Sequence, residues 1–212
     1  MKKYLSSLMV VLGIAAMASA TTVVVFDDFE SYADSTALNA AWVVNTSAVT
    51  TTETLVEEGS GNQYMQLDYE VESPYWAQTK YYLPGVVSGT SGVNLTYQGY
   101  TSLSFDYQIT DVGSGVIYFS AYDCWGQKVL AASWTSTSTT DGWVTVTVDF
   151  TTALQSGMNL ENVAVFTIGA NSVWYSTPTG SFNVDNVTLT QVPEPATMSI
   201  LALGGLLLRR RK

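Results

Sequence analysis

Apolar and polar residues alternate along four short stretches of the chain. Because the side chains of a β-strand point alternately to opposite faces of its sheet, a period of two predicts strands with one buried and one solvated face. We expect the apolar faces of these strands to share a common core. The stretches are residues 65–71, 103–109, 144–148 and 182–189.

The last of these stretches contains a change of phase. Phe182 and Val184 belong to its apolar face, and Val187 resumes that face only after Asp185 and Asn186. An extra residue in one strand of an antiparallel pair produces a β-bulge. We therefore expect a bulge at this point of the final strand.

Turn-forming residues separate the predicted strands at regular spacing. Clusters of Gly, Pro, Asn, Asp and Ser lie between the apolar stretches, and each cluster favours a turn. Helical patterns are short: we expect one turn of helix at residues 35–41 and another near residues 152–156. About nine or ten short strands without long helices predict an all-β fold, a two-sheet antiparallel β-sandwich, over residues 21–191.

The first 20 residues have the order of features typical of a secretory signal peptide. Two lysines precede an apolar run over residues 8–17, and the segment ends in the small residues Ala18, Ser19 and Ala20. Signal peptidases read small residues at these positions. We expect export across the inner membrane and cleavage after Ala20.

The C-terminus combines three features in a fixed order. Pro193, Glu194 and Pro195 precede a mostly apolar run over residues 196–208 and a basic cluster at residues 209–212. This run of 13 residues is short, because roughly 20 are needed to cross a bilayer comfortably. The basic cluster is expected to stay cytoplasmic. We expect a short transmembrane sorting helix that holds the chain transiently in the inner membrane before processing.

These three features together resemble the PEP-CTERM sorting signal, over residues 192–212. The resemblance implies that the partner is an exosortase, which cleaves near the PEP motif. It also implies a Gram-negative-type bacterium that makes exopolysaccharide, and delivery to the cell envelope, cell surface or extracellular matrix. A weak C-terminal membrane anchor is the alternative.

Charge and composition narrow the function of the remaining domain. Between residues 21 and 191 the basic side chains are Lys80 and Lys128, against 17 acidic ones, a net charge of −15. Nucleic acid is excluded as a partner because so few cations cannot neutralise phosphates. The chain contains no histidine, which removes Ser-His-Asp and Cys-His catalysis. The single Cys124 forms no internal disulfide, and we expect a small buried hydrophobe there.

Three landmarks of this domain are similar to those of jelly-roll carbohydrate-binding modules of the galactose-binding-like type. They are FDDFESYADSTALNAAW (residues 26–42), WVTVTVDF (residues 143–150) and SFNVDNVTLT (residues 181–190), in that order. The resemblance implies a jelly roll that binds polysaccharide without catalysis. It also implies a structural Ca²⁺ held by Glu30 and Asp185, which have the hard oxygen ligands that Ca²⁺ prefers. Alternatively, these acids cap strand ends and solvate the surface.

Aromatic residues are the second candidate for a binding function. Six tryptophans and thirteen tyrosines exceed what a core of this size needs. Rings at strand ends or among polar neighbours can stack on sugar faces, while nearby carboxylates bond the hydroxyl groups. Covering sheet edges is the alternative role for such rings, and forming a solvated face is the alternative for the acids. The candidate carbohydrate-binding residues are Trp76, Trp125, Tyr75, Trp174, Asp68 and Glu70.

Three functions remain open at this point. A binding module, for example for the organism's exopolysaccharide, is favoured, and a structural matrix or surface protein without a glycan ligand is the alternative. A glycoside hydrolase ranks last, because Asp68, Glu70 and Glu72 lack the apolar and Trp flanks of catalytic acids on jelly-roll strands. We therefore expect the protein not to be an enzyme.

Overall fold

The computed structural model describes residues 21–46, 50–70, 76–111, 115–136, 142–172 and 179–192. Several of the predictions fall outside these residues. They are the signal peptide with Ala20, the sorting helix with Pro193, Glu194 and Pro195, and the candidate binding residues Tyr75 and Trp174.

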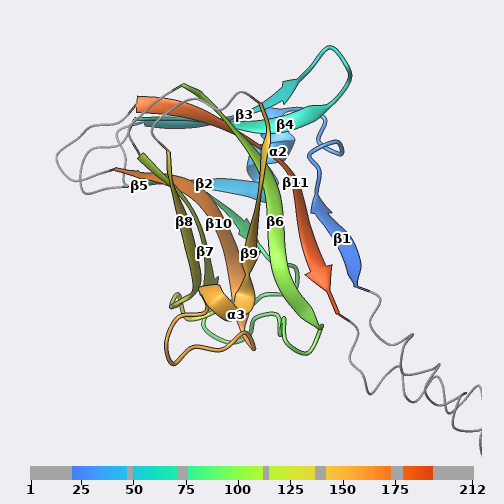
Figure 1. Cartoon of the computed structure of the whole chain (residues 1–212), viewed down its shortest axis with the longest axis vertical. Coiled ribbons are helices and arrows are strands. Elements are labelled where there is room, and N and C mark those ends of the chain that lie inside the picture. The colour runs from blue at the N-terminus through green and yellow to red at the C-terminus, as the bar shows by residue number, and fades with distance from the viewer. Residues whose placement is uncertain are drawn as a thin grey trace, which may run out of the picture.

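The described residues form two antiparallel sheets that face each other across a core (Figure 1). One sheet has the order β3-β4-β11-β6-β9, with β1 also paired to β11, and the other has the order β2-β5-β10-β7-β8. The predicted two-sheet β-sandwich is confirmed. Its strands are β1 (Thr22–Asp27), β2 (Trp42–Thr46), β3 (Thr50–Glu57), β4 (Gln63–Glu70), β5 (Trp76–Tyr82), β6 (Tyr100–Asp111), β7 (Gly115–Asp123), β8 (Lys128–Ser136), β9 (Val144–Asp149), β10 (Val163–Ser172) and β11 (Thr179–Gln191).

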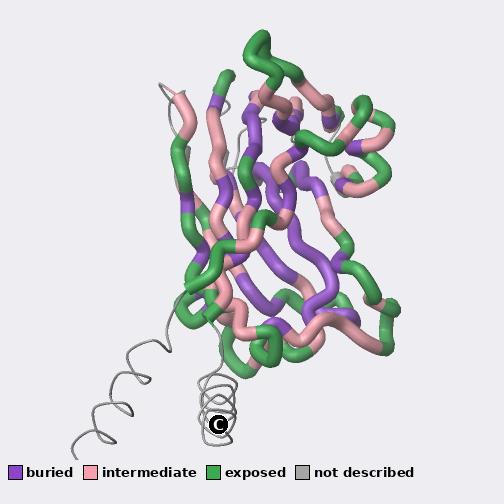
Figure 2. Tube along the Cα trace, turned by 90° about the vertical axis from the view of Figure 1, so that its right-hand side faces the viewer, coloured by how far each residue is buried: buried purple, intermediate pink, exposed green. Residues whose placement is uncertain are grey.

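The core lies between the two sheets and is built from the apolar face of each strand. Figure 2 shows buried residues in the strands and exposed ones mainly in the connecting loops. Phe105 of β6 and Phe182 of β11 are fully buried on one sheet, and Phe119 and Phe166 fill the other side. Each such side chain contributes about 1.5–3 kcal/mol through removal from water. The predicted alternation therefore positions the core, although Val144, at the start of β9, is exposed.

The first predicted helical turn is confirmed as α2 (Ser35–Ala41). Its N-cap is Asp34, whose side chain accepts a hydrogen bond of 2.9 Å from the backbone N–H of Ala37. Such a cap satisfies an N–H group that otherwise lacks a partner in the first turn. Leu38 then places its side chain in the core.

The second helical turn begins earlier than the sequence predicts. It is α3 (Phe150–Ala153), not residues 152–156. Asp149 caps it by accepting hydrogen bonds from the backbone N–H groups of Thr151 and Thr152. Because Phe150 is buried, the cap and the core together set the start of the turn at the end of β9.

The predicted bulge in the final strand is confirmed. The register between β11 and β6 shifts between Asp185 and Thr188, and Asn186 has a φ of 50°. Asparagine tolerates this left-handed conformation better than most residues. The side-chain amide of Asn186 donates a hydrogen bond of 3.0 Å to Asp106 of β6, which holds the bulge in place.

Three further residues are wholly or partly buried. Trp42 is fully buried in the core, and the thiol of Cys124 is buried as expected. Trp143 is half-buried rather than part of the core, and its ring lies 5.3 Å from that of Tyr64 in an edge-on contact. Among the described residues, no helix combines the length and the apolar character required to span a membrane.

Candidate functional site

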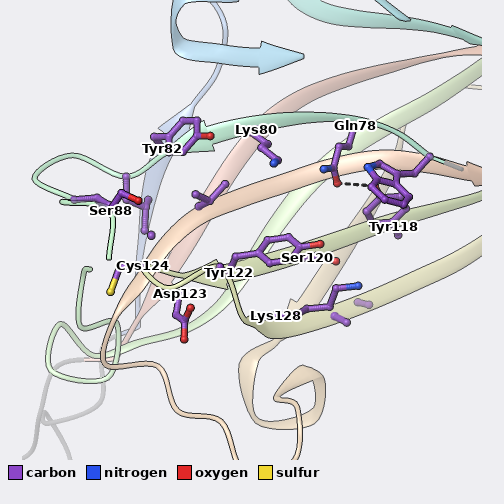
Figure 3. A pocket seen from close by; sticks show the side chains of 18 of the residues that line it. Gln78, Lys80, Tyr82, Ser88, Tyr118, Ser120, Tyr122, Asp123, Cys124 and Lys128 are labelled. Atoms are coloured by element: carbon purple, nitrogen blue, oxygen red, sulfur yellow. Dashed lines mark hydrogen bonds between the residues drawn. The ribbon is translucent and has the colours of Figure 1, made fainter. Parts of the chain in front are cut away.

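A groove of about 1050 Å³ lies on the outer face of the β2-β5-β10-β7-β8 sheet. Its position follows from strand alternation, because side chains that do not enter the core must project from the opposite face. On β7, for example, Phe119 and Ala121 enter the core, whereas Tyr118, Ser120 and Tyr122 line the groove. Figure 3 shows these side chains projecting between β5 and β8.

Strand register arranges the outward residues in rows that cross β5, β10, β7 and β8. Because neighbouring residues in a row are paired across the sheet, each row brings together side chains that are distant in the sequence. The first row is Gln78, Gly169, Tyr118 and Ser133; the second is Lys80, Thr167, Ser120 and Ala131; the third is Tyr82, Val165, Tyr122 and Lys128.

The first row contains a hydrogen bond that spans a strand. The hydroxyl group of Tyr118 donates to Oε1 of Gln78 at 2.7 Å (Figure 3). Gly169 of β10 lies between these two residues, and its lack of a side chain leaves room for the bond. A Cβ atom at residue 169 would lie 2.3 Å from the carbonyl oxygen of Ala77 and 2.7 Å from Cβ of Gln78.

The Tyr118–Gln78 bond fixes the polar chemistry of the groove floor. Burial raises the pKa of Tyr118 well above its usual range, so the phenol stays protonated and continues to donate. Gln78 is buried, and the bond restrains its amide group in the groove. These two side chains can bond sugar hydroxyl groups in a fixed orientation.

Aromatic rings line the groove on β5 and on β7. Trp76 and Tyr82, at the two ends of β5, are 41% and 54% exposed. Tyr122 stands on β7, and Nζ of Lys128 lies 5.8 Å from the centre of its ring. Exposed rings beside polar groups are suited to stacking against the C–H faces of sugars.

The described lining of the groove contains one carboxylate, that of Asp123. Its Oδ1 accepts hydrogen bonds from the backbone N–H groups of Trp125 (3.0 Å) and Gln127 (2.8 Å). This carboxylate therefore stabilises the turn between β7 and β8. Trp125 is 57% exposed on that turn but does not line the groove.

The sequence candidates do not all come together. Trp76 lines the groove, but Asp68 and Glu70 lie on β4, in the opposite sheet. The side chains of Leu67 and Tyr69 enter the core there, so Asp68 and Glu70 project from the outer face of that sheet. Both carboxylate oxygens of Asp68 accept hydrogen bonds from the amide of Gln66, at 2.9 and 3.1 Å.

Several groove residues were missed by sequence reasoning. The signal that could have found them is the alternation of Trp76, Gln78, Lys80 and Tyr82, which share one face of a strand. That stretch reads as mostly polar and aromatic, because Ala77 is the one aliphatic side chain on its inward face and is a weak signal of its phase. The missed residues are Gln78, Lys80, Tyr118, Ser120, Tyr122 and Lys128.

The predicted metal ligands Glu30 and Asp185 do lie near each other. Burial raises the pKa of Asp185, and the negative charges of Asp106 and Glu30 raise it further. Asp185 accepts hydrogen bonds from Asn62 (3.2 Å) and from the backbone N–H of Asn186 (2.7 Å). Repulsion between neighbouring carboxylates is the condition that a bound cation relieves.

Glu30 and Asp185 carry the type of ligand atom that a hard cation prefers. Glu30 and Asp185 offer carboxylate oxygens, which Ca²⁺ prefers. However, Oε1 of Glu30 also accepts a hydrogen bond of 2.9 Å from the backbone N–H of Gln63, so a cation would share these oxygens with amide donors. Within the described part of the chain, no three acidic, His or Cys side chains form a group able to hold a metal.

Comparison with known proteins identifies the C-terminal segment. Residues 191–212 match the family described as the PEP-CTERM protein-sorting motif. The predicted sorting signal is therefore confirmed. This motif marks an exported protein that an exosortase sorts to the surface of a Gram-negative-type bacterium. A sequence search among curated proteins gave no match.

Solved structures with a similar fold include two carbohydrate-binding modules. The family 11 module from Clostridium thermocellum, in complex with a β-1,3-1,4-mixed-linked tetrasaccharide, is 19% identical, with a TM-score of 0.56 over 81% of this chain and 96% of that one. A module with specific mannan recognition is 16% identical, with a TM-score of 0.50 over 81% and 98%.

An enzyme is also among the similar structures. An arabinose-bound α-L-arabinofuranosidase is 12% identical, with a TM-score of 0.55, and the match covers 78% of this chain and 25% of that one. At such identities, all three similarities show a shared β-sandwich fold. The predicted resemblance to the fold of carbohydrate-binding modules is confirmed.

Proposed function

We propose that this exported, exosortase-sorted protein binds a polysaccharide in the groove of the β2-β5-β10-β7-β8 sheet, without catalysis. The observation that carries the proposal is the composition of the groove. Aromatic rings on its walls, including Trp76 and Tyr82, accompany a fixed hydrogen-bonding pair, Tyr118 and Gln78, on its floor. Sugar rings need both kinds of contact, because each ring has apolar C–H faces and polar hydroxyl edges.

The groove is open enough for a chain of sugars. Its volume of about 1050 Å³ reaches the upper end of the roughly 300–1,000 Å³ that is usual for small-molecule pockets. Trp76 and Tyr82 stand six residues apart on one strand, or about 20 Å at the usual rise per residue. A polymer that follows β5 could contact both rings at once. The fold shared with carbohydrate-binding modules supports the same conclusion.

A non-catalytic role is favoured by the carboxylates of the groove. Glycoside hydrolases use two carboxyl groups that face each other across the scissile bond, about 5 to 10 Å apart. Among the described lining residues there is one carboxylate, Asp123, and its Oδ1 is engaged by two backbone N–H groups of a turn. We therefore favour binding over hydrolysis, even though one similar structure belongs to a glycoside hydrolase.

The experiment is affinity electrophoresis of the purified full chain through gels that contain one polysaccharide each. We expect retardation by at least one glycan. Trp76→Ala and Tyr82→Ala should each weaken it by about tenfold, which corresponds to about 1.4 kcal/mol of stacking and burial. Tyr97→Ala is the matched control, because Tyr97 is 80% exposed and does not line the groove.

Three results would contradict the proposal. Equal mobility in every glycan gel, for a protein that unfolds cooperatively, would favour the structural matrix protein instead. Loss of binding in Trp125→Ala but not in Trp76→Ala would place the site on the β7–β8 turn. Release of reducing sugar from a bound glycan would establish catalysis.

We also propose that Glu30 and Asp185 hold a structural Ca²⁺. The support is the position of Asp185, which is buried and whose pKa is raised by burial and further by the negative charges of Asp106 and Glu30. A cation there would link the segment after β1 to the bulge of β11, and so would stabilise the sandwich rather than take part in ligand binding.

Finally, we propose the cell envelope or the extracellular matrix as the destination of the processed protein. The support is the sorting motif at residues 191–212. A polysaccharide-binding domain released at the cell surface would meet the exopolysaccharide of its own organism there.

A further inference from the structure

Positive charge is confined to one place in the domain. Between Thr21 and Val192 the sequence has two basic side chains, Lys80 and Lys128, and 17 acidic ones. Both lysines line the same groove. In a domain with this excess of acids, the remaining surface repels anions and the groove is the exception.

The two lysines stand on opposite sides of the groove floor. Lys80 projects from β5 and Lys128 from β8, with β10 and β7 between them (Figure 3). Three strand spacings of about 4.8 Å each separate their backbones by roughly 14 Å across the sheet. A polymer lying between these walls would therefore meet an ammonium group on each side.

No carboxylate of the described residues neutralises either ammonium group through an ion pair. The pKa of Lys80 is lowered by burial, and no neighbouring negative charge offsets this effect. The ammonium group of Lys128 lies over the ring of Tyr122. The nearby Asp123 uses its Oδ1 to accept the backbone N–H groups of its own turn. Both cations thus remain available to an external anion.

We propose that the groove binds an acidic polysaccharide, a polymer whose sugar rings carry carboxylate groups. This inference rests on the proposed function, because it names the ligand class of the same groove. The rings of Trp76 and Tyr82 contact the sugar faces, and Lys80 and Lys128 pair with carboxylates on the two sides of the chain. A partly buried lysine loses hydration, and an anionic ligand restores the stabilisation that water gave it.

The acidic surface adds selectivity to this arrangement. Repulsion from the surrounding carboxylates disfavours a polyanion everywhere except in the groove, so an acidic polymer is directed to the groove. An acidic peptide offers the same charge, but it lacks the C–H faces that match the aromatic walls. We therefore infer a glycan as the ligand.

The experiment compares matched pairs of soluble oligosaccharides by isothermal titration calorimetry with the purified full chain. The pairs are oligogalacturonate with its methyl ester, and β-1,4-glucan oxidised to the carboxylate at C6 with unoxidised β-1,4-glucan. We expect at least one acidic member to bind about tenfold or more tightly than its neutral partner. This preference should weaken as salt rises, because ions screen charges at this exposure.

Charge variants locate the effect. In Lys80→Gln/Lys128→Gln, the preference for the acidic member should fall to about twofold or less, while any binding of the neutral member persists. Arg210→Gln/Arg211→Gln also removes two positive charges, but from the C-terminal basic cluster, and should leave the preference unchanged. Lys80→Arg/Lys128→Arg keeps both charges and should retain most of the preference. Thermal melting of each variant checks that the fold is intact.

The outcomes separate the two proposals. Equal binding of acidic and neutral members, unaffected by the lysine double variant, would overturn the acidic ligand and leave carbohydrate binding in place. Binding of neither member of either pair, together with equal mobility in every glycan gel, would overturn both. Binding of poly-glutamate as tight as that of the acidic oligosaccharide would overturn the glycan and favour an acidic peptide.

Discussion

Glu53 is an acidic side chain in the interior of the sandwich. It lies on β3, where it pairs with the core residue Leu67 of β4, and it is 4% exposed. Neither of its carboxylate oxygens has a hydrogen-bond partner among the described residues. Burial raises the pKa of Glu53 to about 7, although a polar contact from Thr79 on the facing sheet opposes part of this rise.

This shift makes Glu53 destabilising as the pH rises. Below about pH 4.5 the carboxyl is protonated in both the folded and the unfolded state, so its ionisation does not affect the free energy of unfolding. Between pH 4.5 and 7 the unfolded chain ionises while the folded protein stays protonated, so the free energy of unfolding falls. A shift from 4.5 to about 7, at about 1.36 kcal/mol per pKa unit, gives a loss of about 3 kcal/mol that is complete above pH 7.

Glu53→Gln removes the ionisation and keeps the shape. The free energy of unfolding of Glu53→Gln minus that of the wild type should increase by about 3 kcal/mol between pH 4 and pH 8. At pH 4 the variant should be equal to the wild type or less stable, because a buried amide also lacks partners. The assay is urea unfolding of the full chain, followed by tryptophan fluorescence at several pH values.

Glu57→Gln is the control for the Glu53 experiment. Glu57 ends the same strand but is exposed, so Glu57→Gln removes one carboxylate from the surface and leaves the buried groups unchanged. If the difference between Glu53→Gln and the wild type stayed constant from pH 4 to pH 8, the buried carboxyl would have an ordinary pKa in the folded protein. The reasoning from burial would then be refuted.

Three more predictions follow from the structure. Gly169→Ala should destabilise the domain by about 1–3 kcal/mol in urea unfolding and weaken glycan binding, because the new Cβ atom would overlap backbone atoms of β5. The control is Gly59→Ala, which should change the stability little because no atom lies within 4 Å of its Cβ position. Calcium at 100 times its Kd should raise the melting temperature by roughly 5–10 °C, and Glu30→Gln should remove this effect. Equal melting temperatures in calcium and in chelator would contradict the proposed Ca²⁺ site. Glu194→Ala in the PEP motif should leave the chain unprocessed in the membrane fraction, as seen by immunoblot. Normal processing of this variant would show that sorting does not require Glu194.

The fold was predictable because alternation is a local property. Phe182 and Val184 alternate with polar residues, and the phase change at Asp185 and Asn186 is visible without any knowledge of the neighbouring strands. The buried face of each such strand can therefore be read from the sequence of that strand alone. The start of α3 was missed because it depends on Asp149, a single capping residue that also reads as the polar end of a strand.

The groove was less predictable because it depends on which strands become neighbours. Gln78 and Tyr118 are 40 residues apart, and Gly169 lies 51 residues further on. Their side-chain bond exists because β10 inserts between β5 and β7 in one particular register. No local pattern specifies that insertion, whereas the position of Trp76 among polar residues was enough to suggest an exposed ring.

The two lysines also depend on which strands become neighbours. Their rarity was plain in the sequence, but it first served to exclude nucleic acid, since two cations cannot neutralise a nucleic-acid backbone. Pairing of Lys128 with Tyr122, and of Lys80 with Thr167, places both lysines over one groove floor. Two charges in one groove are too few for a phosphate polymer, but they suffice for two carboxylates on a sugar chain that the rings of Trp76 and Tyr82 already position. The same acidic composition that excludes one class of polyanion thus gives the other a single place to bind.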